Sequence, residues 1–282
     1  MRSSKHSLGL LAVICAVSIA FFPSMGEAQR REAQKRTKKS VQLEQMNTDL
    51  IYSASRGYED TVSNLILQGA DVNSRDPDGM TPLMRAAFMG YKGVVEILLQ
   101  EGADPNIMDV YGTTALMQAS WAGHMDIAQA LLSAGADPNL KGQELLPSLK
   151  KKGVTALMAA SMHGNPDLAR QLIAKGAKVN QQDDEGQTAL ILAAREGNAE
   201  VAKVLISNKA DTEIRDKFGR TPLIVATIFG HTSVVRVLLL GGANMRGRDI
   251  NHLTAYSYAR SMDRNDIMQL LNYAGRRNAR RY

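Results

Sequence analysis

The residues of this chain that have chemically reactive side chains are few and widely spaced. Five histidines and one cysteine occur in 282 residues, and none of them has a spacing that catalysis or metal binding requires. The sequence contains no Gly-rich phosphate loop, no paired-histidine zinc motif and no Gly-x-Ser-x-Gly motif. Aspartate and glutamate occur mostly where turns and helix surfaces place them. We therefore predict no catalytic residue, no metal site and no cofactor, and we do not expect an enzyme.

Two of the histidines instead mark a regularity of the chain. His124 and His231 stand at matching positions, each directly after a glycine. We predict a structural role for both, because a metal site needs several converging ligands. The only cysteine, Cys15, lies inside an N-terminal apolar run. If that run is removed, the mature chain has no thiol for a disulfide, for catalysis or for metal ligation.

The regularity is an internal repeat with a recurring seven-residue box. Thr81–Ala87 reads Thr-Pro-Leu-Met-Arg-Ala-Ala, and weaker copies begin at Thr48 and Thr254. Successive copies are 33 residues apart, except for one step of 41 residues. A fixed period of this size is typical of stacked supersecondary units. The other strong copies are Thr114–Ser120, Thr155–Ser161, Thr188–Ala194 and Thr221–Thr227.

Each repeat is predicted to form two short helices. Thr81 is a residue type that caps helix N-termini, and Pro82 follows it where the first helical turn needs no N–H. A glycine nine residues after the threonine ends the first helix, and a glycine 21 residues after it ends the second. Asp263 and Lys209 are the exceptions at these two places.

With these offsets the chain resembles the ankyrin-repeat family from Thr48 to about Gly275. The resemblance implies an all-α solenoid of about seven repeats, placed at residues 46–275, with more polar terminal repeats as caps. The family's box usually carries histidine after leucine, where this chain has apolar residues. We therefore expect either more hydrophobic packing between repeats or a weaker tie between hairpin loops. These apolar residues are Met84, Met117, Met158, Ile191 and Ile224.

The first 28 residues are predicted to be a secretory signal peptide. A positive segment precedes the 15-residue apolar run Leu8–Phe22, and Gly26 and Ala28 fit cleavage after Ala28. The alternative is an uncleaved membrane anchor, although a spanning helix needs about 20 apolar residues. Ankyrin arrays are commonly intracellular, so an exported one indicates a bacterial protein in the periplasm or outside the cell.

The positive charge of the chain lies at its ends. The net charge is +6, and residues 1–28, 29–40 and 276–282 carry +1, +5 and +4, which leaves −4 for residues 41–275. We predict a basic flexible leader at residues 29–45 and a basic tail at residues 276–282. The leader is either a solvated segment or a patch for an acidic partner, membrane phosphates or nucleic acid. No nucleic-acid partner is expected, because a nucleic-acid-binding core is basic on one face.

The 41-residue step places an insertion in one loop, at residues 141–152. Insertions in repeat arrays map to loops on one face, which is often the binding face. Leu145, Leu146 and Leu149 would give this loop a short apolar turn. The insertion is therefore either tolerated extra length or a finger that touches a partner.

The resemblance implies that partners contact the hairpin tips and the exposed ends of the first helices. Large residues of the types that anchor interfaces occupy these places. The alternative is that they pack between neighbouring repeats and meet no partner. The predicted partner-binding residues are Met80, Tyr111 and Phe218 at the tips, and Phe88, Met89, Trp121, Met162, His163, Ile228 and Phe229 at the helix ends.

We expect an exported scaffold that binds another protein through its concave face and performs no catalysis. One alternative is a membrane-tethered adaptor, in which the N-terminal segment stays uncleaved as an anchor and the basic leader lies against lipid headgroups. Another is a regulator or protector of a periplasmic enzyme such as a catalase, because some exported bacterial members of the family are similar in layout.

Overall fold

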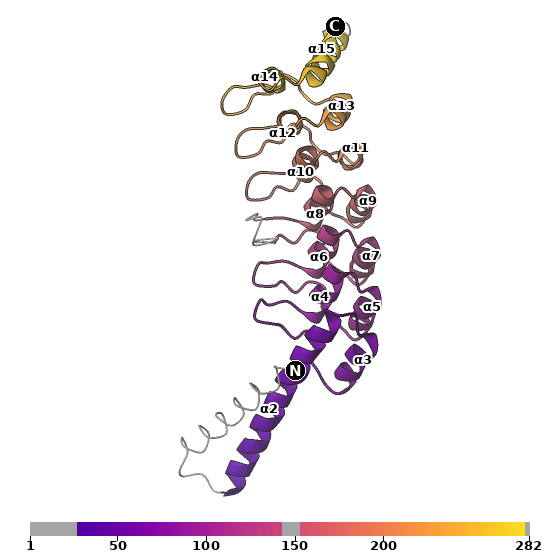
Figure 1. Ribbon diagram of the computed structural model, residues 1–282, viewed down its shortest axis with the longest axis vertical. Helices are drawn as coiled ribbons and strands as arrows, with labels where there is room; N and C mark the ends of the chain where they lie inside the picture. The colour runs from indigo at the N-terminus through magenta and orange to yellow at the C-terminus, as the bar shows by residue number, and fades with distance from the viewer. Residues whose placement is uncertain (1–26, 143–152, 280–282) are drawn as a thin grey trace.

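The computed structural model describes residues 27–142 and 153–279, which form an elongated stack of helix pairs (Figure 1). These residues contain 14 helices and no strand, with one isolated antiparallel bridge between Gly142 and Val154. The expected all-α repeat solenoid is confirmed. Most of the predicted signal peptide, most of the insertion and the last three residues of the tail lie outside the described residues.

Two columns of helices run along the stack, and the hairpin loops project beside the first column (Figure 1). The long helix α2 (Glu27–Ala54) supplies the first helix of the first repeat. The later first helices are α4 (Pro82–Met89), α6 (Ala115–Ala122), α8 (Ala156–His163), α10 (Ala189–Glu196), α12 (Pro222–Phe229) and α14 (Ala255–Ser261). The second helices are α3 (Glu59–Leu67), α5 (Lys92–Gln100), α7 (Met125–Ser133), α9 (Pro166–Ala174), α11 (Ala199–Ser207), α13 (Thr232–Leu240) and α15 (Asn265–Ala279).

The first helices begin and end as the repeat predicts. The hydroxyl oxygen of Thr81 accepts the N–H of Met84 at 3.2 Å, and the capping threonines of the later first helices do the same. Gly90 ends α4 with φ 85°, a left-handed conformation that glycine adopts without steric cost. The two exceptions adopt the same conformation without glycine, Lys209 with φ 65° and Asp263 with φ 52°.

A continuous apolar core runs through the array. It includes the residue after the box leucine, which is at most 1% exposed in every strong copy, from Met84 to Ile224. Adjacent first helices contact one another along the column, so these buried side chains stabilise the contact between repeats. These apolar residues are therefore part of the core between repeats, as hydrophobic packing there requires.

Side chains of one repeat also hydrogen-bond to the backbone of the next. The side-chain oxygen of Asn106 accepts the N–H of Asp137 at 2.8 Å, and its amide donates to the carbonyl oxygen of Gly135 at 3.1 Å. Equivalent bonds from a backbone N–H to a side chain of the preceding repeat recur along the array. The first is the one that Asn47 accepts, and the last is the one that Asn244 donates. The loops are therefore tied together without the family's histidine.

Neighbouring hairpins share a backbone hydrogen bond. Val110 donates its N–H to the carbonyl oxygen of Asp78 at 3.0 Å, and Ile250 donates to that of Phe218 at 3.1 Å. Pro77 occupies the corresponding place in the first hairpin and has no N–H to donate. Among the described residues no hairpin precedes Pro77, because the pair α2 and α3 begins the array.

The basic leader is helical, in contrast to the flexible segment expected at residues 29–45. Helix α2 continues through it without a break, and only its end is anchored, with Leu50 buried in the array. Residues 31–40 are almost all exposed. They are mostly Ala, Gln, Glu, Lys and Arg, which favour helix, so the anchored end propagates the helix outward. At the other end, α15 continues into the predicted basic tail as far as Ala279.

Replacing Lys209 by glycine is expected to stabilise the array by about 1 kcal/mol, because glycine adopts this left-handed conformation without the side-chain penalty. The matched control is Gly102→Lys at the equivalent place, where an added Cβ would meet no heavy atom within 4 Å. The control should lose a similar amount of stability for the same conformational reason. Urea denaturation measures both changes, and a destabilised Lys209→Gly would contradict the explanation.

Candidate interaction face

Five hairpin tips are each organised by one aspartate. The Oδ1 atom of Asp109 accepts the N–H groups of Tyr111 at 2.9 Å and Thr113 at 2.7 Å. Two bonds to one carboxylate oxygen hold the intervening residues in a fixed turn, as aspartate commonly does. The same pair of bonds forms at Asp76, Asp183, Asp216 and Asp249.

The second carboxylate oxygen distinguishes one tip from another. At Asp216 it accepts from Nε of Arg220 at 2.8 Å. At Asp183 the Oδ2 atom is buried and has no hydrogen-bond partner among the described residues. Burial raises the pKa of Asp183 to about 6, and the charges of Glu185 and Asp184 add to the rise, although N–H bonds to Oδ1 lower it. This tip therefore holds a carboxyl group that titrates close to neutral pH.

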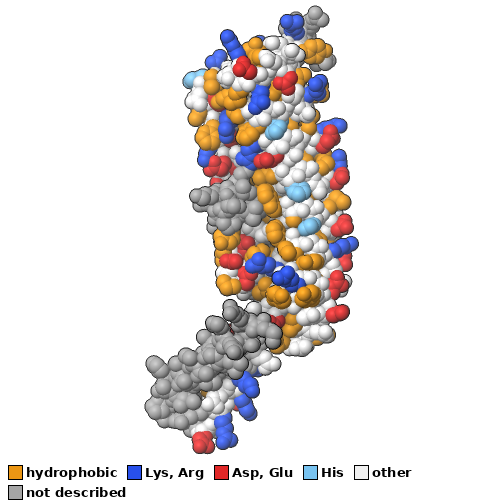
Figure 2. Space-filling model, viewed as in Figure 1, with side chains coloured by type: hydrophobic (Ala, Val, Ile, Leu, Met, Phe, Trp, Pro, Cys, Tyr) orange, Lys and Arg blue, Asp and Glu red, His pale blue; other side chains and the backbone are white. Residues whose placement is uncertain are grey.

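The C-terminal ends of the first helices line up along the array, and we call them the helix-end row. Figure 2 shows hydrophobic side chains gathered over the first helices and loops, and charged side chains along the edge where the second helices lie. The row consists of Phe88, Met89, Trp121, Met162, His163, Arg195, Glu196, Ile228 and Phe229.

The predicted site residues differ in exposure. Four of them are open to solvent, with exposed fractions of 38% for Phe88, 48% for Met89, 43% for Phe218 and 47% for Phe229. His163 is also exposed, and Tyr111 is half-buried. The remaining four are half-buried and pack against the core, namely Met80, Trp121, Met162 and Ile228.

An ion pair interrupts the row. Arg195 Nε lies 3.0 Å from a carboxylate oxygen of Glu196, and a second guanidinium nitrogen donates to Gln187 at 3.3 Å. The row therefore presents two apolar patches. We call Phe88, Met89, Trp121 and Met162 the N-terminal patch.

The second patch extends onto the last two hairpins. Ile250 is 61% exposed and Leu253 is 39% exposed, and neither was among the predicted site residues. Leu253 directly precedes Thr254, as Met80 directly precedes Thr81. The repeat offset therefore predicts a tip position for Leu253, although the last copy of the box is weak and this position is harder to recognise. We call Phe218, Ile228, Phe229, Ile250 and Leu253 the C-terminal patch.

Each helix end is held by the repeat that follows it. His124 donates from Nε2 to the carbonyl oxygen of Phe88 at 3.1 Å, and His231 donates to that of Arg195 at 2.9 Å. The predicted structural role of these two histidines is confirmed. His163 lies against the preceding repeat, because a Cβ added at Gly123 would be 2.5 Å from its imidazole. The row is thus a fixed surface rather than a set of loose helix ends.

Cations flank the exposed aromatic ring of the C-terminal patch. The guanidinium of Arg220 lies 4.5 Å from the ring centre of Phe218, and the ammonium group of Lys217 lies 5.2 Å from it. Lys217 also pairs with Glu185 of the preceding hairpin. These contacts hold the ring in place at the tip while one edge remains in water.

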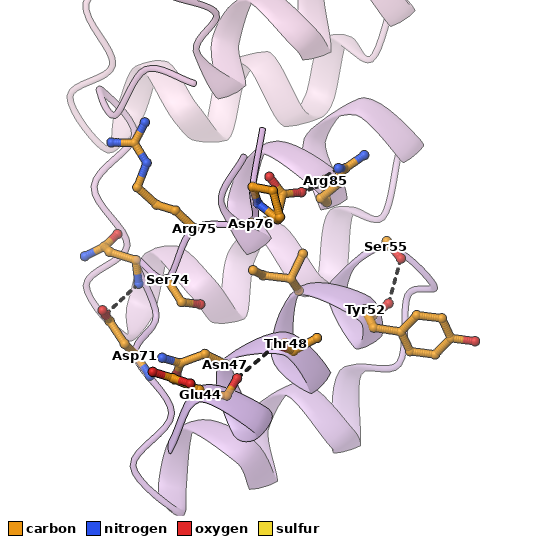
Figure 3. Close-up of a pocket in the computed structure, with 13 residues that line it drawn as sticks. Glu44, Asn47, Thr48, Tyr52, Ser55, Asp71, Ser74, Arg75, Asp76 and Arg85 are labelled. Carbon is orange, nitrogen blue, oxygen red and sulfur yellow. Dashed lines mark hydrogen bonds and ion pairs between the residues drawn. The ribbon is translucent and has the colours of Figure 1, made fainter. Parts of the chain in front are cut away.

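A cavity of about 660 Å³ lies at the N-terminal end of the face, between α2 and the first hairpin (Figure 3). It occupies the place where a preceding hairpin would pack. Its two cations already serve the fold, since Arg85 pairs with Asp76 and Arg75 donates to the carbonyl oxygens of Gly79 and Met108. The cavity therefore offers no uncommitted cation to a ligand.

Two further features of the described residues concern metal binding and membrane crossing. No group of three or more His, Cys, Asp or Glu side chains in residues 27–142 and 153–279 is placed to hold a metal ion. None of the helices described there combines the length and the apolar composition that crossing a bilayer requires.

The sequence matches a known family model over most of its length. The model describes ankyrin repeats in groups of three copies, and it matches residues 50–142, 143–216 and 190–280. A comparison with curated proteins found no match.

The pH dependence of stability tests the burial of Asp183. A carboxyl group with a raised pKa in the folded state holds its proton more tightly there, so the stability it contributes is full below about pH 4. That stability is then lost as the pH rises through about 6. Relative to Asp183→Asn, the wild type should lose on the order of 3 kcal/mol of unfolding free energy across this window.

Asp249→Asn is the matched control for this measurement. Burial acts to raise the pKa of Asp249, but hydrogen bonds from Tyr258, Leu253 and Asn251 outweigh it and lower the pKa. The stability from Asp249 is therefore lost only as the pH falls below about 4, the opposite direction. Urea denaturation at several pH values gives both difference curves. A flat curve for Asp183 between about pH 4 and 6 would show that its carboxyl group is solvated.

Proposed function

Because this chain belongs to the ankyrin-repeat family, whose members generally bind other proteins, we propose that it is an exported scaffold that binds a protein through its helix-end row and hairpin tips. The concave side of a repeat array, lined by first helices and loops, gives an extended surface for such contact. No catalytic role is proposed, and the partner's identity is left to experiment.

The observation that supports this proposal most strongly is the exposure of Phe88, Met89, Phe218 and Phe229. Phe88 and Met89 belong to one patch and Phe218 and Phe229 to the other, and exposed apolar patches mark interaction sites on soluble proteins. Aromatic residues and methionine are also enriched where interfaces are buried. The hydrogen bonds from His124 and His231 hold the backbone of the row, so binding would order few residues and lose little entropy.

The two patches define the shape of the proposed partner. The N-terminal patch and the C-terminal patch lie on opposite sides of the Arg195–Glu196 pair. A partner that covers both needs two apolar contacts with a polar segment between them, because burying the ion pair under an apolar surface would be costly. The energy of binding is expected to concentrate in the two patches.

The double variant Phe88→Ala/Met89→Ala is expected to weaken partner binding at least about tenfold while leaving the melting temperature unchanged. Its control is Leu240→Ala, which removes a 77% exposed apolar side chain from the second column. Affinity capture with wild-type, variant and control baits identifies the partner, and titration with that partner gives the affinities. Unchanged affinity of the double variant, or equal loss in the control, would contradict binding at the helix-end row.

Export is proposed from the sequence of the first 28 residues. Sequencing the N-terminus of the protein recovered from its native compartment is expected to give a mature chain that begins at Gln29. A chain that begins at Met1 and stays with the membrane fraction would instead indicate the uncleaved anchor.

A further inference from the structure

The N-terminal part of α2 is a helix that projects beyond the array. Figure 1 shows α2 leaving the stack at its N-terminal end, and the other end of the helix packs against α3 and α4. Residues 27–43 contain six Lys and Arg residues and two Glu residues. The stability of the array and the binding face do not explain a strongly positive segment that projects beyond the array.

Four cations of this helix share one side. Arg31, Lys35, Lys38 and Lys39 follow the spacing i, i+4, i+7 and i+8, which places them on one face, and all four are exposed. Ala33, Thr37 and Ser40 lie on the opposite side, with Arg36 beside them. We call the four cations the basic face of α2.

The lysines of the basic face are uncommitted within the described residues. Ion pairs in this helix join Arg31 to Glu27 at 4.0 Å and Arg36 to Glu32 at 3.6 Å, and none involves Lys35, Lys38 or Lys39. Exposed pairs of this kind are worth little, so Arg31 is also available to a partner.

We propose that the basic face of α2 docks on the headgroups of an anionic lipid bilayer. Lys and Arg clusters beside a membrane segment bind anionic lipid electrostatically. The apolar run Leu8–Phe22 ends only a few residues before α2 begins at Glu27. If this run enters a bilayer, it brings α2 close to the bilayer surface, whether the run is later cleaved or kept. No long apolar stretch occurs in α2, so the helix would lie on the surface and would not span it.

Two observations favour lipid over nucleic acid as the phosphate-bearing partner. Residues 27–51 contain no Phe, Trp or Tyr that would stack on bases. Residues 41–275 have a net charge of −4, so the array would repel a polyanion that wrapped around it, whereas a flat bilayer meets only the projecting helix. Docking through α2 would leave both apolar patches free for a protein.

The test uses the full chain and two kinds of lipid vesicle, pure phosphatidylcholine and a mixture containing about 30% phosphatidylglycerol. Residues 8–22 contribute equally to both, so the difference between vesicles reports the electrostatic part. We expect at least about tenfold stronger binding to the anionic vesicles at low salt, and a loss of that preference at about 0.5 M salt.

Matched charge reversals locate the effect. Lys35→Glu/Lys38→Glu/Lys39→Glu should abolish the preference for anionic vesicles. Lys92→Glu/Lys203→Glu/Arg236→Glu makes the same change of net charge on exposed second-column residues and should retain the preference. Circular dichroism checks that both variants keep their helix content.

Three results would overturn the proposal. They are equal binding of the wild type to both vesicles, equal loss of preference in the two triple variants, and complete displacement from anionic vesicles by duplex DNA or RNA at a lower phosphate concentration. The last result would identify a nucleic acid as the occupant of the basic face.

Discussion

The box leucine of each strong repeat is buried between neighbouring repeats, and the stability of the whole molecule depends on this burial. From Leu83 to Leu223 the leucine of every strong box is 1% exposed, although each helix pair is too thin to enclose it alone. Tyr256 occupies the same place in the last described repeat and is 40% exposed. Burying a leucine contributes roughly 1.5–3 kcal/mol, so stability accumulates at the contacts between repeats rather than within them. The aspartate turns and the asparagine bonds keep those contacts in register.

Much of this fold was predictable from the sequence because its signals are local. Threonine caps and terminal glycines act within one helix, so they fix helix bounds without knowledge of the neighbours. The same logic explains Lys209, which takes the left-handed conformation that the turn requires although it is not glycine. The hydrogen bond that Asn106 accepts from the N–H of Asp137 was not predictable in this way, because the two residues are 31 positions apart and meet only when repeats stack. The charge of the leader predicts a flexible segment, whereas its helix-forming residues, attached to an anchored helix, favour continuation of α2.

The candidate site was predictable in position but not in exposure. Repeat offsets place Phe88, Trp121 and Met162 at equivalent or adjacent helix-end positions, yet Phe88 is exposed and the other two pack against the core. At Met162, Arg195 of the next repeat reaches back toward the sulfur at 3.9 Å. Such pairings depend on two side chains in different repeats, and the period alone does not specify them.

Pro77 affects how a second molecule could extend the stack beyond the first hairpin. The carbonyl oxygens of Asp78, Glu185 and Phe218 each accept an N–H from the hairpin that follows. A second molecule arriving before the first hairpin would need the equivalent N–H from residue 77. Proline cannot supply it, and edge prolines commonly protect proteins from unwanted pairing. A filament built from head-to-tail copies requires two complementary termini. Pro77 removes the inter-hairpin hydrogen bond from any such contact at the first hairpin.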